Sequence, residues 1–164
     1  MKMDEKAKEL EWHQKTAKKL FNITWDLIDK KSRTIEEEDL MIHSAHASRY
    51  HWGEVVSAGM PNTGPINLER GDWQISRVYS ILKKPEIAEY FAKRCIDICE
   101  KNGIGGFDIA FAYEAMARAC AVAGNREADV QKYITLAKSA GNKIEEKGNK
   151  EYFFSELETI LGYS

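Results

Sequence analysis

Residues 107–140, FDIAFAYEAMARACAVAGNREADVQKYITLAKSA, contain the signals of two complete helices joined by a short turn. The first helix is rich in alanine and other strong helix formers, and Asp108 stands where an N-cap residue can accept hydrogen bonds from the free amides of the first turn. Gly124 and Asn125 end this helix, and apolar residues recur at helical spacing over about 126–140. Because the connection is so short, the two helices must pack antiparallel.

An earlier segment repeats the same pattern. In the first helix of each pair, Ile75, Ser76 and Tyr79 precede Met116, Ala117 and Cys120 by 41 residues. In the second helix of each pair, Ala88, Ala92 and Cys95 precede Val130, Ile134 and Ala137 by 42 residues. An internal repeat of helix pairs predicts units that stack side by side and share one continuous core.

These positions resemble the tetratricopeptide repeat. That family places a large apolar residue and then a small one in its first helix (helix A), an aromatic residue one turn later, and small or apolar residues four and three apart in its second helix (helix B). The resemblance covers about residues 68–161, and the period here exceeds the family's 34 residues because the helices are longer. It implies a right-handed array whose A helices line a concave groove that binds a protein or peptide.

Apolar periodicity, helix caps and Gly/Pro-rich stretches elsewhere in the chain predict further helices. An apolar stripe over residues 3–29 predicts a long amphipathic helix. Thr34 and Glu37 form a capping-box pattern at the start of a second helix, which ends near Ser57. A loop rich in glycine and proline spans 57–67, and Pro85 stands at the first position of another helix.

The predicted fold is therefore all-α, with about seven helices in antiparallel pairs that stack as a tetratricopeptide-like right-handed array. We expect one domain over residues 1–164, because a chain of this length can bury a single core. Residues 1–57 form an N-terminal helix pair in this scheme. Residues 68–161 hold the repeats and a C-terminal capping helix around Tyr152–Leu157.

The repeat offset also indicates which side chains would face the groove that the resemblance implies. Arg77 and Arg118 occupy equivalent places in the two A helices, and both lie away from the small, packed positions. The groove would present six side chains: Arg70, Trp73, Arg77, Phe111, Glu114 and Arg118. Arginine offers paired donors to carboxylates, and aromatic rings anchor apolar groups, so an acidic peptide segment is the expected partner. Alternatively, Glu114 and Arg118 satisfy each other as an i,i+4 pair and Trp73 belongs to the core.

A second function is suggested by the histidines. Asp39, His43 and His46 share one helix face and could bind a divalent metal in a small helical-bundle enzyme. The pattern contains neither the glutamate of HExxH nor a third suitably placed histidine. We therefore expect no bound metal and no other cofactor, while the choice between an enzyme and an interaction scaffold stays open.

Composition excludes some partners. The net charge of −2 creates no overall field for nucleic acid or an anionic membrane, and no apolar run is long enough to span a bilayer. The charged N-terminus does not resemble a signal peptide, so a cytoplasmic location is expected. Cys95, Cys99 and Cys120 are expected to be reduced thiols in the core. A homo-oligomer is also compatible with this reading.

Overall fold

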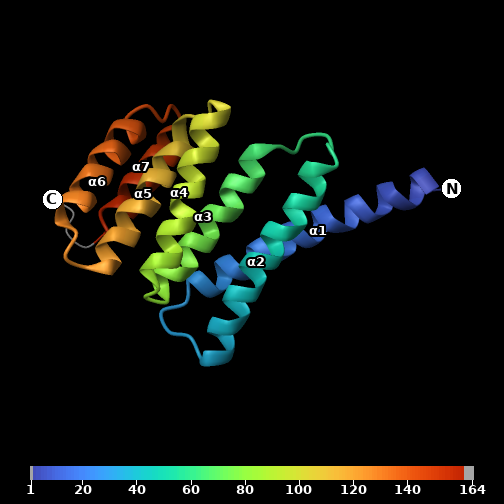
Figure 1. The fold of residues 1–164 in the computed structure, drawn as a ribbon, viewed down its shortest axis with the longest axis horizontal. Coiled ribbons are helices and arrows are strands. Elements are labelled where there is room, and N and C mark those ends of the chain that lie inside the picture. The colour runs from blue at the N-terminus through green and yellow to red at the C-terminus, as the bar shows by residue number, and fades with distance from the viewer. Residues whose placement is uncertain (1, 161–164) are drawn as a thin grey trace.

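A computed structural model describes residues 2–160, and seven helices account for most of this range (Figure 1). They are α1 (Lys2–Ile28), α2 (Ile35–Ser57), α3 (Pro65–Ile81), α4 (Pro85–Asn102), α5 (Gly106–Ala123), α6 (Glu127–Gly141) and α7 (Lys147–Leu157). The described residues contain no strand. The all-α prediction is confirmed.

The helices form two layers. Each helix packs on its neighbour in the chain, most extensively within the pairs α1–α2, α3–α4 and α5–α6. The odd-numbered helices also contact one another in series, α1 with α3, α3 with α5, and α5 with α7. We call this series the inner layer. The first pair joins the rest mainly through α2 and α3, and α7 covers the open end beside α5 and α6 (Figure 1).

The burial pattern is compatible with the internal repeat. All twelve positions that define it are buried, and the structure places them at the contacts within and between the pairs: Ile75, Ser76, Tyr79, Ala88, Ala92, Cys95, Met116, Ala117, Cys120, Val130, Ile134 and Ala137. Alanine, serine and cysteine at these sites let helix backbones approach closely. The three cysteines are free and buried, as expected.

Two helix starts confirm the sequence signals. Thr34 caps α2, and the reciprocal bonds between Thr34 and Glu37 complete a capping box. Pro85 is the first residue of α4, and Gly103 ends that helix in the left-handed region with φ of 63°. Only glycine adopts this conformation at little cost.

Two other helix starts differ from the predictions. Helix α3 begins at Pro65 rather than near Leu68, because the Asn67 side chain accepts a bond from the backbone amide of Gly64 (2.9 Å) and extends the first turn. Helix α5 begins at Gly106, so Asp108 lies inside the helix and is not its N-cap. The Asp108 carboxylate accepts instead from Arg70 of α3.

One buried carboxylate on α3 links this helix to α2 and α4. Asp72 of α3 is fully buried and pairs with Arg49 of α2 at 2.9 Å and with Arg94 of α4 at 3.0 Å. Charged groups this deep are stable only when they are paired. The cluster fixes α3, which carries half of the predicted groove residues, between its neighbours.

Candidate binding site

The six predicted groove residues all lie on α3 and α5 of the inner layer, but they divide into two groups. Arg77, Glu114 and Arg118 form an ion cluster beneath α7. Arg70, Trp73 and Phe111 line a pocket between α1, α3, α5 and α7. The two groups have different chemistry.

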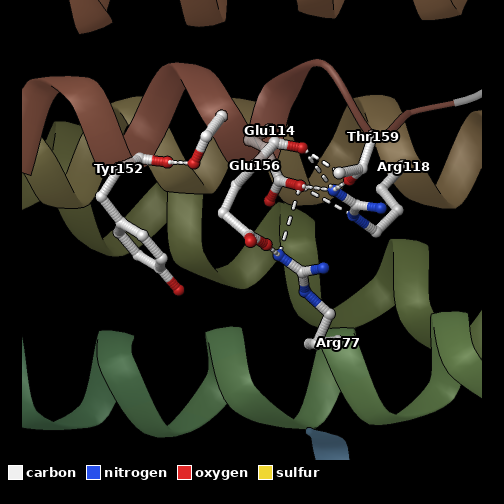
Figure 2. Close-up of polar contacts among 7 residues, drawn as sticks. Arg77, Glu114, Arg118, Tyr152, Glu156 and Thr159 are labelled. Carbon is white, nitrogen blue, oxygen red and sulfur yellow. Dashed lines mark hydrogen bonds and ion pairs between the residues drawn. The ribbon is translucent and has the colours of Figure 1, made fainter. Parts of the chain in front are cut away.

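The ion cluster is centred on Glu114, whose side chain is fully buried (Figure 2). Arg118 donates from Nε to Glu114 Oε1 at 2.7 Å, and Arg77 Nη2 lies 3.5 Å from the same oxygen. Arg77 also donates to Glu156 Oε2 of α7 at 2.7 Å. Burial opposes the charge on Arg77, but Glu114 and Glu156 favour it, and the net effect raises the pKa of Arg77.

Helix α7 and Thr159 just beyond its end lie against the two arginines. Arg118 Nη2 donates to the backbone oxygen of Glu156 at 3.0 Å and to Thr159 Oγ1 at 2.8 Å (Figure 2). The sequence pattern pointed to Glu114 as a partner of Arg118, and the structure adds Glu156 as a second carboxylate beside Arg77. An acidic partner for this pair stays a prediction, and such a partner would have to compete with Glu156.

The pocket has a volume of about 410 Å³. Its walls are mainly aromatic and come from all four inner-layer helices. The aromatic residues are Phe21 and Trp25 of α1, Trp73 of α3, Phe107 and Phe111 of α5, and Tyr152 of α7. Trp73 contacts two of the other rings: its ring centroid lies 5.4 Å from that of Trp25 and 5.6 Å from that of Phe111. The volume lies at the lower end of the range of about 300–1,000 Å³ for ligand sites in proteins.

The pocket also contains a closed ion pair. Arg70 donates two parallel hydrogen bonds to Asp108, from Nε to Oδ1 at 2.8 Å and from Nη2 to Oδ2 at 3.2 Å. This bidentate geometry is the strongest form of an arginine–carboxylate contact. It neutralises both groups at the pocket wall.

Glu69 is a second acid in the pocket wall, and it is almost completely buried at 1% exposure. Desolvation raises its pKa to about 9, with a further increase from Asp108 and Asp72 and a partial decrease from Arg70. Its Oε1 has no hydrogen-bond partner among the described residues, and the same holds for Nε1 of Trp73. Buried polar atoms of this kind are rare in proteins and call for an explanation.

Sequence reasoning missed four of the pocket's aromatic residues and its second acid. Phe21 belongs to the apolar stripe predicted for the first helix, but Trp25 and the contact with α3 could not be inferred from periodicity. The resemblance covered only the later helices, so it gave no reason to place α1 against the groove. Nothing in the sequence marks Glu69 as buried, since its neighbours include Arg70 and Gly71.

The histidine face does not assemble a metal site. Asp39 and His43 are exposed, whereas His46 is partly buried and its Nε2 lies 2.9 Å from the Tyr79 hydroxyl of α3. No group of three His, Cys, Asp or Glu side chains in the described part of the chain is arranged to hold a metal ion. His51 pairs with His13 of α1, with 2.7 Å between their Nδ1 atoms.

No helix within residues 2–160 combines the length and the apolar character needed to cross a bilayer. Comparisons with protein-family models, with curated proteins and with solved structures find no match for this chain. The candidate site is therefore defined by its geometry alone: an aromatic pocket with a closed ion pair and a buried, unpaired acid.

Proposed function

We propose that this protein is an interaction scaffold, built as a tetratricopeptide-like right-handed array, that binds a protein or peptide segment along its inner helix layer. The aromatic pocket anchors one side chain of that segment. In this proposal the specificity comes from the pocket, and the ion cluster around Glu114 holds α7 in place.

One observation carries the proposal. Six aromatic side chains from four helices line a cavity of about 410 Å³ that the chain's own side chains do not fill. Aromatic anchors in a preformed pocket supply most of the energy of many protein interfaces. The cavity is too small for a whole peptide but has a suitable size for one side chain.

The proposal is tested by selecting binders from a random peptide library with the wild-type protein, followed by affinity measurements on two matched variants. Trp25→Leu removes part of the pocket wall, whereas Trp12→Leu changes an exposed tryptophan on the same helix that does not line the pocket. We expect selected peptides to lose affinity for Trp25→Leu by at least about tenfold, which corresponds to about 1.4 kcal/mol, and to keep it for Trp12→Leu.

Two results would overturn this function. One is a library that yields no enriched sequence. The other is a set of enriched peptides that bind wild type and Trp25→Leu equally, provided that thermal melting shows both proteins to be folded.

A further inference from the structure

We propose that the aromatic pocket binds an alkylammonium group, with the aromatic rings around its carbon atoms and the Glu69 carboxylate as its counter-charge. This inference rests on the proposed function for its use of the pocket, and it adds the chemistry of the group that the pocket takes.

The first argument is the composition of the walls. The face of an aromatic ring carries a partial negative charge, and a cation within about 6 Å of its centroid is attracted to it. Trp73 already makes such a contact on the side of the ion cluster, where the Arg77 guanidinium lies 5.5 Å from its ring centroid. The pocket brings five further rings to the same place.

The second argument is the charge balance of the site. Asp108 is paired with Arg70, and Asp72 is paired with Arg49 and Arg94. Glu69 makes no ion pair within residues 2–160, and its Oε1 lacks a partner there. Among the residues that line the pocket, Arg70 is the one cation and Glu69 and Asp108 are the two acids, so the lining carries one excess negative charge when Glu69 is ionised, which matches a monovalent cation.

An anionic ligand fits this geometry poorly. The Arg70 guanidinium already gives Nε and Nη2 to Asp108, so an anion could use only its remaining donors and would lie beside two carboxyl groups. A neutral apolar group would contact the rings but would leave the buried Glu69 Oε1 without a partner, which is unfavourable. A cation is attracted to the faces of the aromatic rings and also balances the charge of the Glu69 carboxylate.

The cation also changes the protonation of Glu69. In the unbound protein, burial keeps this carboxyl protonated at neutral pH, since its pKa is raised to about 9. The charged or titratable groups that surround it from the packed helices are Arg70, Asp72, Asp108, Cys95, Cys99 and Tyr152. An ammonium group beside Glu69 favours the carboxylate, so binding should release a proton to solvent.

The test uses two probes of nearly the same shape, choline and the uncharged 3,3-dimethylbutan-1-ol, measured by titration calorimetry. We expect wild type to bind choline at least about tenfold more tightly than the alcohol. Glu69→Gln should remove this preference, whereas Glu86→Gln, the same substitution at an exposed position of α4, should keep it.

Proton release gives a second readout that a purely structural role for Glu69 would not produce. The affinity of wild type for choline should rise between about pH 6 and about pH 8, by up to tenfold per pH unit, because each bound cation releases up to one proton. The affinity of Glu69→Gln should not change over this range. Equal binding of choline and the alcohol, no saturable binding of choline, or a pH-independent affinity would each overturn the inference.

The source of the group is distinguished by a further pair of probes, the amides of N-acetyl-lysine and N-acetyl-trimethyllysine. Binding of either with the same Glu69 dependence identifies a lysine side chain of a partner, and binding of choline alone identifies a small molecule. Library peptides that need Trp25 but contain no cationic residue would retain the proposed function and overturn this inference. Choline binding by a protein for which the library yields no peptide binder would retain this inference and overturn the proposed function.

Discussion

Gly71 of α3 lies directly against the side chain of Arg49 of α2: a Cβ atom added at position 71 would stand 2.7 Å from Arg49 Cδ. This close approach lets the Arg49 guanidinium reach Asp72, the buried carboxylate that joins α2, α3 and α4. The identity of residue 71 is therefore coupled to an ion pair that lies one position further along the chain.

Gly71→Ala should lower the free energy of unfolding by about 1–3 kcal/mol, because the added methyl group forces Arg49 away from Asp72. The matched control is Gly53→Ala within α2, where the new Cβ would lie 3.5 Å from Arg49 Nη1, an ordinary contact. Alanine in a helix interior gains about 0.5–1 kcal/mol over glycine, so the control should be as stable as wild type or more stable. Urea unfolding measures the stability of both variants. Equal stability of Gly71→Ala and Gly53→Ala would contradict a steric clash between residue 71 and Arg49.

Glu114→Gln should destabilise the fold by about 3–5 kcal/mol, because it removes the carboxylate that Arg77 and Arg118 share and leaves two buried cations with less compensation. The exposed Glu86→Gln serves as control and should change stability by less than about 0.5 kcal/mol. Denaturant midpoints report the difference. If Glu114→Gln unfolds like its control, the cluster does not hold α7 onto α5.

Glu69→Gln should stabilise the protein at neutral pH and have little effect in acid. The native state keeps a proton up to a pKa of about 9, whereas the unfolded chain releases it above the ordinary value of 4.5. The free energy of unfolding of wild type therefore falls as the pH rises through this window, by at most about 1.4 kcal/mol per pH unit.

The measurement compares the unfolding free energies of wild type and Glu69→Gln at about pH 5 and about pH 7, a range within this window. We expect the difference in favour of the variant to grow at the higher pH. A difference that stays constant would mean that Glu69 is ionised in the native state.

His51→Gln should reduce the sensitivity of the N-terminal pair to acid. Burial lowers the pKa of His51, and the neighbouring His13 lowers it further. Between the lowered native value and the ordinary value of 6.5, the unfolded chain binds more protons, so wild-type stability falls as the pH drops through this window. Thermal melting between about pH 7 and about pH 5 tests this. The same loss in His51→Gln and wild type would exclude His51 as its source.

The sequence by itself determined the helices and which repeat positions are buried. Local signals such as the capping box of Thr34 and Glu37 and Pro85 at a helix start depend on neighbours within one turn, so they can be read along the chain. The twelve repeat positions depend on periodicity, and all of them are buried. At Asn67 and Asp108 the side chains make hydrogen bonds that these local signals do not reveal. There the observed helix starts differ from the predicted ones.

Only the tertiary structure decided what the groove residues do. The equivalence of Arg77 and Arg118 followed from the repeat, but Glu156 lies 79 residues from Arg77 along the chain, and no local pattern predicts that they pair. The pocket depends in the same way on α1 contacting α3 and on α7 contacting α5. Burial and ion pairing arise from contacts distant in sequence, and for that reason Glu69 became an unpaired acid among aromatic rings without any sign in its neighbours.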